Sequence, residues 1–214
     1  MFRFLCPIAA LAFAANINAA TVLGNLDSRT PGDPVLFGSS TSITTLQSKA
    51  AAFTVDSTTS LGSVYLALSN FDDQDVFDVF IGSLSGTVIT KLVDLVLMAP
   101  MRTNSNESQV WQFDPASMFT LSPGTTYALT LTGGGGTAYT WGRVGGSPVT
   151  PTGSATFTGY YFSDSLVPSF SPATDPNNTN SFAIIDTIAP VPAPGAIVLL
   201  PLGLALIAWR RVRG

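Results

Sequence analysis

Histidine is missing from the 214-residue sequence, and cysteine occurs once, at Cys6, inside an apolar N-terminal run. Zinc sites built on Cys or His, thiol chemistry, and Ser-His or Cys-His catalysis therefore lack the side chains that they need. Glutamate also occurs once, at Glu107, and only 10% of the residues are charged. The sequence thus predicts a protein that is not an enzyme and that holds no cofactor.

Residues 1–20 have the pattern of a secretory signal peptide. One basic residue, Arg3, precedes an apolar run over 4–15, and the segment ends in the small residues Ala19 and Ala20. Such a segment is removed on export, and Cys6 would be lost with it. A lipoprotein anchor at Cys6 is the alternative, but this cysteine comes early, with no small residue before it.

The other end of the chain predicts a membrane span with an Arg-rich cytoplasmic tail over residues 195–214. From 191 to 209 nineteen residues carry no charge, and as a helix they would rise about 28 Å, close to the roughly 30 Å of a bilayer core. Arg210, Arg211 and Arg213 follow at once, which would hold this end in the cytoplasm and leave the preceding chain outside. A buried helix of a soluble domain is the alternative, but nothing amphipathic runs through the segment.

Just before this span the chain reads Val191, Pro192, Ala193 and Pro194. Together with the Gly/Ala/Leu span and the Arg run, these residues resemble the PEP-CTERM class of C-terminal sorting signals, in its Val-Pro-x-Pro variants. Ala193 stands where the commonest form has Glu. The resemblance implies an exosortase-like sorting protease that cleaves near the motif, so that the protein is anchored in the inner membrane only transiently and then reaches the cell surface or the medium.

The part between the two ends is acidic. Residues 21–190 hold five basic and thirteen acidic residues, a net charge of −8. Such a domain should repel phosphate backbones, so we expect no nucleic-acid partner. The segment is also rich in Thr, Ser, Gly and Asn, a composition that suits strands and turns better than helices.

Short apolar–polar alternations bounded by Gly, Pro, Asp or Asn recur along residues 21–186 and predict half-buried antiparallel strands. An all-β, jelly-roll-like β-sandwich is therefore expected for this range, followed by a Pro-rich stalk over 187–194. The expected strands are 35–38, 51–55, 63–69, 76–82, 87–97, 109–114, 125–132, 137–142, 154–162 and 181–185.

Two of these runs allow the buried face to be assigned. In 61–69, Val64, Leu66 and Leu68 share one face, which we expect to face the core, while Leu61 falls on the other. In 125–132 the inward face should carry one aromatic and two aliphatic side chains. These are Tyr127, Leu129 and Leu131, and the strand follows a turn whose Pro123-Gly124 pair suits type II.

The same domain resembles the choice-of-anchor domains, most closely the R type. These are extracellular β domains of bacterial proteins whose C-termini carry different anchoring signals, so the resemblance implies a surface or matrix protein without an assigned activity. The matching segments are 21–26, 52–55, 61–66, 121–129 and Trp141.

A ligand site is the alternative reading of two features. Asp72, Asp73 and Asp75 could bind Ca²⁺ in a loop between strands, although they lack the glycine and terminal Glu of an EF-hand, and a solvated turn is the competing explanation. Aromatic side chains could stack on sugar rings, although packing in the core or on a sheet face is the more frequent role of such residues. They are Tyr139, Trp141, Tyr160 and Tyr161.

A glycosidase carboxylate pair would need an acid and a base at a set distance, which a sequence does not show. Glu107 lies in an Asn/Ser-rich loop pattern, and we expect no catalytic role for it. The sequence therefore predicts an exported, non-enzymatic component of the cell surface, matrix or biofilm. A polysaccharide- or Ca²⁺-binding module is the alternative, with an extracellular polysaccharide as its partner.

Overall fold

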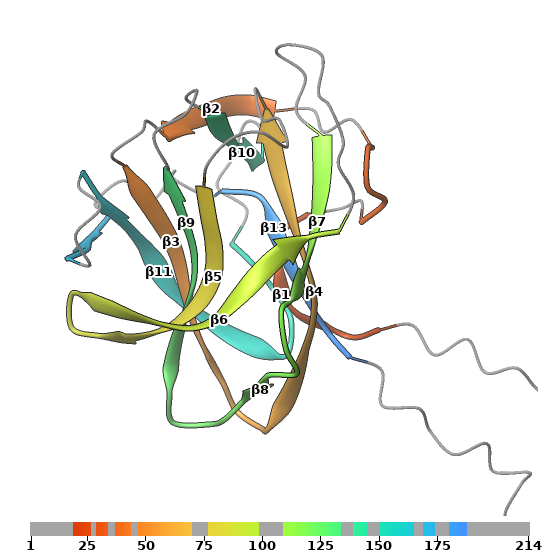
Figure 1. The fold of residues 1–214 in the computed structure, drawn as a ribbon, viewed down its shortest axis with the longest axis vertical. Helices are drawn as coiled ribbons and strands as arrows, with labels where there is room; N and C mark the ends of the chain where they lie inside the picture. Colours follow the sequence, from red (N-terminus) through yellow and green to blue (C-terminus); the bar gives the residue numbers. More distant parts are fainter. Residues whose placement is uncertain are drawn as a thin grey trace, which may run out of the picture.

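The computed structural model of the protein describes residues 19–26, 29–33, 37–43, 47–69, 77–98, 109–133, 139–144, 150–164, 169–173 and 180–187. All regular structure in these ranges is β-strand, and every strand pair is antiparallel, which confirms the expected all-β class (Figure 1). The strands are β1 (Thr21–Gly24), β2 (Phe37–Ile43), β3 (Ser48–Val55), β4 (Thr59–Ser69), β5 (Phe77–Ser85), β6 (Val88–Leu97), β7 (Gln109–Pro115), β8 (Thr120–Leu121), β9 (Thr126–Gly133), β10 (Tyr139–Val144), β11 (Ala155–Ser163), β12 (Ser171–Pro172) and β13 (Phe182–Asp186).

The strands form one continuous curled sheet rather than two separate ones, and its two arms take the place of the layers of a sandwich. The first arm has the order β1-β13-β4-β7, the second arm the order β5-β9-β3-β11-β12, and β6 pairs with both. Strand β10 pairs with β4 and β2, and β8 pairs with β4. Figure 1 shows β6 crossing from one arm to the other.

A β-bulge lets β6 serve both arms. Val93 pairs with Ile81 and Lys91 pairs with Gly82, so Leu92 is an extra residue on the β6 side. An extra residue bends a strand and increases its twist. It also reverses the alternation, so that Ile89 packs on the outer face, whereas Val93 packs into the main core.

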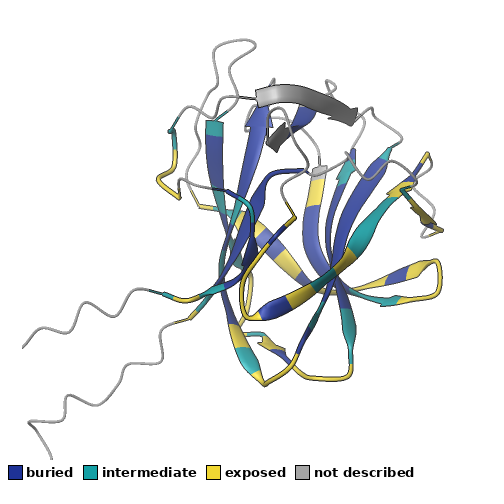
Figure 2. Cartoon of the chain, turned by 180° about the vertical axis from the view of Figure 1, so that it is seen from behind, coloured by how far each residue is buried: buried dark blue, intermediate teal, exposed yellow. Residues whose placement is uncertain are grey.

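The main core lies between the two arms and draws side chains from nearly all the longer strands. Its largest fully buried side chains are aromatic: Trp111, Trp141, Phe53, Phe113 and Phe182. Figure 2 shows the buried residues concentrated along the strands of both arms, and the exposed ones mainly at the turns. Because the charged residues are few, this apolar core dominates the stability of the fold.

The predicted inward face of β4 is confirmed, with one correction. Val64, Leu66 and Leu68 are fully buried in the main core, but Leu61, expected on the outer face, lies in the same core. The cause is a second bulge: Val64 pairs with Ile184 while Leu61 pairs with Asp186, so β4 carries one residue more than β13 over this step.

The predicted face of β9 and its preceding turn are also confirmed. Tyr127, Leu129 and Leu131 belong to the main core. Gly124 has a φ of 82°, the left-handed value that the third position of a type II turn requires. The backbone N–H of Ser122 donates to the Tyr127 hydroxyl at 2.8 Å, so the buried phenol is satisfied by the turn that introduces it.

Three short strands, β1, β8 and β12, were not predicted as strands, and β2 runs over Phe37–Ile43 rather than 35–38. The signal peptide up to residue 18, the Asp72–Asp75 loop, Glu107 and the whole tail from residue 188 lie outside the described residues. Within the described part of the chain, no helix is long and apolar enough to cross a membrane.

Candidate functional site

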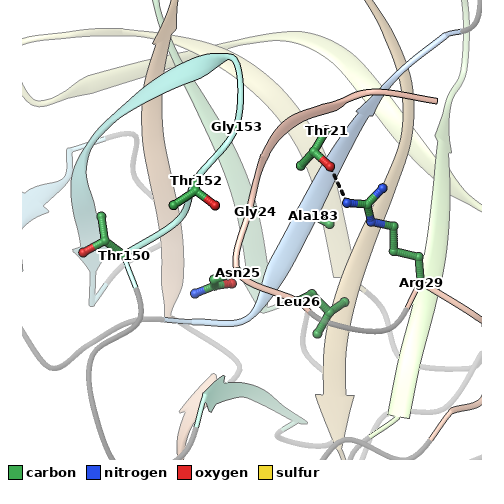
Figure 3. Close-up of a pocket in the computed structure, with 9 residues that line it drawn as sticks. All are labelled: Thr21, Gly24, Asn25, Leu26, Arg29, Thr150, Thr152, Gly153 and Ala183. Atoms are coloured by element: carbon green, nitrogen blue, oxygen red, sulfur yellow. Dashed lines mark hydrogen bonds between the residues drawn. The ribbon is translucent and has the colours of Figure 1, made fainter. Parts of the chain in front are cut away.

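A polar hollow of about 430 Å³ lies where the free edge of β1 meets residues 150–154 (Figure 3). Five lining side chains are polar and two are apolar, and two glycines complete the wall. The polar ones are Thr21, Asn25, Arg29, Thr150 and Thr152, the apolar ones Leu26 and Ala183, and the glycines Gly24 and Gly153.

Backbone hydrogen bonds between β1 and residues 150–154 form a seam that joins the two arms on the side away from β6. Gly24 and Thr152 exchange N–H···O bonds of 2.8 Å in both directions. The N–H of Ser154 also donates to the carbonyl of Thr21, at 3.3 Å. These bonds hold the two walls of the hollow at a fixed separation.

Glycine is needed on this seam because the chains approach very closely. A Cβ added at Gly153 would lie 2.3 Å from the carbonyl oxygen of Val22, and one added at Gly24 would lie 2.8 Å from Cα of Ala183. No side chain fits at such distances without a backbone shift. At these two glycines the wall of the hollow is therefore main chain. The side chains on the exposed part of the wall come from the neighbouring threonines.

The floor of the hollow is a fixed amide. Asn25 Nδ2 donates to the carbonyl of Asn180 at 3.1 Å, and Asn25 Oδ1 accepts from the N–H of Phe182 at 3.0 Å. Both ends of the side-chain amide are thus held by the segment that enters β13. The orientation of the amide follows from these two bonds, because its nitrogen only donates and its oxygen only accepts.

Tyr160 of β11, on the other arm, bonds to the same carbonyl as Asn25 does. Its hydroxyl donates to the carbonyl of Asn180 at 3.0 Å. Burial raises the pKa of Tyr160 well above its usual range, and a side-chain hydrogen bond with Asn25 acts in the opposite direction. The phenol stays protonated at neutral pH and serves as a donor, not as an acid or a base.

Arg29 is the only charged residue among those that line the hollow. Its side chain is exposed, and Nη2 donates to Oγ1 of Thr21, as the dashed line in Figure 3 shows. Among the described residues no carboxylate forms an ion pair with this guanidinium. A cation is therefore held at one side of a hollow that otherwise offers hydroxyl groups.

A further charged group among the described residues is an ion triad on the β5–β6 hairpin. Lys91 Nζ lies 2.7 Å from Oδ2 of Asp78 and 2.8 Å from Oδ1 of Asp94. Partial burial alone would lower the pKa of Lys91, but the hydrogen bonds and charges of the two aspartates outweigh it and raise the pKa. The ammonium also lies 5.0 Å from the ring centre of Phe80, so the triad clips β5 to β6.

The structure shows where three of the four aromatic residues that could stack on sugar rings are packed. Trp141 is fully buried in the main core, where Nε1 donates to the carbonyl of Ser181 at 2.9 Å, so it is not a sugar-stacking platform. Tyr160 is packed against the same core, and Tyr161 packs against a smaller cluster on the outer face. The side chain of Tyr139 lies outside the described residues.

The other predicted site residues are not placed by the structure. The sorting residues 191–194, the arginines at 210, 211 and 213, and the candidate Ca²⁺ ligands Asp72, Asp73 and Asp75 lie outside the described ranges. Within those ranges no group of three or more acidic, His or Cys side chains is arranged to hold a metal ion.

Sequence reasoning missed the hollow. The residues of its two walls are more than 120 positions apart in the sequence. A few threonines and one arginine do not form a recognisable sequence motif. The only local signal was the pair of Gly24 and Gly153, which becomes meaningful once β1 and residues 150–154 are known to touch. Comparison with protein-family models, curated proteins and solved structures gives no match to this chain.

Proposed function

We propose that the chain is an exported, non-enzymatic component of the cell surface or extracellular matrix, delivered by its C-terminal sorting signal. The structural observation that supports this proposal is the pairing of the first and last strands. Thr21 of β1 lies opposite Ile185 of β13, and the N–H of Asp186 donates to the carbonyl of Ala20 at 2.9 Å.

Because β1 and β13 are antiparallel, the chain enters the domain beside the point where it leaves. Thr187 is held as well, through its N–H to the carbonyl of Ser60 at 3.0 Å. In Figure 1 the two ends of the described fold emerge side by side. A domain built in this way begins and ends at a single pole, so a segment that follows β13 would hold it from that pole, which suits presentation from a membrane.

The pattern of the two ends supplies the rest of the proposal. The signal-peptide pattern of residues 1–20 directs the chain out of the cytoplasm. The sorting residues Val191, Pro192, Ala193 and Pro194 would be read by an exosortase-like protease, with Arg210, Arg211 and Arg213 holding the span until it is cut. The β domain would then be released or re-anchored at the surface.

Cell fractionation tests this proposal. Full-length protein and a variant truncated after residue 186 are expressed in a host that has the sorting enzyme and in the same host without it. We expect the full chain in the membrane fraction without the enzyme and at the surface or in the medium with it, while the truncated chain is released in both. Full-length protein that stays soluble in the cytoplasm in both hosts would contradict the proposal.

A second candidate function is binding of an extracellular polysaccharide. The observation that favours it is the polar hollow, whose exposed threonines and single arginine offer hydrogen bonds of the kind that sugars use. The Ca²⁺ alternative depends on Asp72, Asp73 and Asp75, which lie outside the described residues, and remains a prediction.

A further inference from the structure

We propose that the hollow beside β1 binds a carboxylate-bearing sugar, such as a uronate unit of an acidic polysaccharide, with Arg29 holding the carboxylate. This inference rests on the second candidate function and not on how the chain is sorted. It is carried by charge, by the geometry of Arg29, by the hydroxyl groups of the walls and by the size of the hollow.

Charge comes first. The domain between residues 21 and 190 has a net charge of −8, so most of its surface repels anions. The hollow is an exception, because Arg29 is its only charged lining residue and none of the nine lining residues is acidic. An anionic group is therefore drawn to this place in preference to the rest of the described surface.

The guanidinium is already positioned. Its bond from Nη2 to Thr21 Oγ1 holds the group at the side of the hollow. Guanidinium N–H groups form a rigid fork that matches the two oxygens of a carboxylate, and charge-assisted bonds of this kind are about twice as strong as neutral ones. Since no described carboxylate takes this fork, an incoming one can.

The walls fit the rest of a sugar. Figure 3 shows Thr21 and Arg29 on one side of the hollow, with Thr150 and Thr152 on the other. Threonine hydroxyls both donate and accept, as sugar hydroxyls do. Both Thr150 and Thr152 are exposed. A sugar could therefore replace the water molecules that bond to their hydroxyl groups, and no buried residue would have to move.

The size and shape suit a weak site for one sugar unit within a chain. A volume of about 430 Å³ falls in the range of roughly 300–1,000 Å³ that is typical of small-molecule sites. No aromatic ring lines the hollow, so stacking does not contribute. We therefore expect a dissociation constant on the order of 1 mM for a single uronate, with tighter binding for an oligomer that spans several copies of the protein.

The test is a titration of the full chain, followed by NMR or calorimetry, with glucuronate, glucose and acetate as probes. Glucose has the same ring without the carboxylate, and acetate has the carboxylate without the ring. We expect glucuronate to bind at least five-fold more tightly than either. Equal binding of glucose would overturn the role of the charge, and equal binding of acetate would overturn the role of the sugar.

Variants then locate the site. Arg29→Gln, which keeps hydrogen-bonding groups but removes the charge, should weaken glucuronate at least five-fold, and Thr152→Val should weaken it two- to three-fold. Lys91→Gln removes the same charge from the β5–β6 hairpin, away from the hollow, and should leave glucuronate binding unchanged. Thermal melting of each variant verifies that the fold is retained.

Two outcomes separate this inference from the function that it rests on. If acidic and neutral polysaccharides bind equally and Arg29→Gln has no effect, polysaccharide binding stands but the assignment to the hollow is wrong. If neither glucuronate nor any oligosaccharide binds at 20 mM, on the order of 20 times the expected constant, both are wrong. The sorting proposal is unaffected by either result.

Discussion

The hydroxyl of Tyr160 donates to the backbone carbonyl of Asn180 at 3.0 Å, and so ties β11 of the second arm to the segment that enters β13 of the first. This bond lies next to the seam between β1 and residues 150–154. It is a side-chain link between the two arms. Its contribution can be measured directly.

Replacing Tyr160 by Phe should lower the free energy of unfolding by about 1–2 kcal/mol, because a mostly buried carbonyl loses a donor while the ring packing is kept. The melting temperature should fall by roughly 2–8 °C for a domain of this size. Tyr161→Phe is the matched control, since Tyr161 packs on the outer cluster, and it should change stability little. Equal effects of the two substitutions would contradict the role of the bond.

Tyr160 also predicts how stability depends on pH. Its pKa is raised in the folded state by burial, so the folded and unfolded chains bind the same proton below about pH 10. Above that pH the unfolded tyrosine ionises first, and stability falls by up to about 1.4 kcal/mol per pH unit. Urea melts at pH 8 and pH 11 should show this loss in the native protein, and a smaller loss in Tyr160→Phe. An identical loss in both would contradict the prediction.

Lys91→Gln removes the cation that Asp78 and Asp94 share. Because the three side chains are 39–55% exposed, the loss of stability should stay below about 1 kcal/mol. It should shrink further in 1 M NaCl, where the Debye length is about 3 Å. Lys91→Arg, which keeps the charge, should be close to the native protein. A loss that persists in high salt would mean that packing on Phe80 matters more than charge.

Gly153→Ala should be among the most destabilising single changes at the surface. The added Cβ would lie 2.3 Å from the carbonyl oxygen of Val22, so the seam must open. We expect a cost of roughly 3 kcal/mol or more, from overpacking together with backbone strain. Gly86→Ala is the control: its φ is 61° but nothing lies within 4 Å of an added Cβ, so only about 1–2 kcal/mol of strain is expected. Chemical denaturation of both variants measures the two free energies of unfolding, and equal losses would contradict the role of the close contact at Gly153.

Alternation alone predicted the strands that form the walls of the main core. Expected runs at 87–97, 109–114 and 125–132 differ from β6, β7 and β9 by no more than one residue at each end. For 125–132 the inward face followed from the same period of two, which placed Tyr127 in the core. Local signals were sufficient here because each strand has one face toward the core and one toward its surroundings.

Alternation failed where the pairing partner changes the register. Leu61 reaches the core because β4 has an extra residue opposite β13, and Ile89 lies outside because Leu92 is an extra residue opposite β5. Neither bulge has a sequence signal of its own. The hollow was out of reach for a related reason, since only the tertiary fold brings Arg29 and Thr152 together.

The proposed function requires export and processing at the two ends of the domain, which the β1–β13 pair holds side by side. Mass spectrometry of the protein recovered from its native cells tests this directly. We predict a mature N-terminus at Ala20 or Thr21 and a C-terminus within or next to Val191, Pro192, Ala193 and Pro194. An intact chain that begins at Met1, ends at Gly214 and is recovered from the cytoplasm would contradict it.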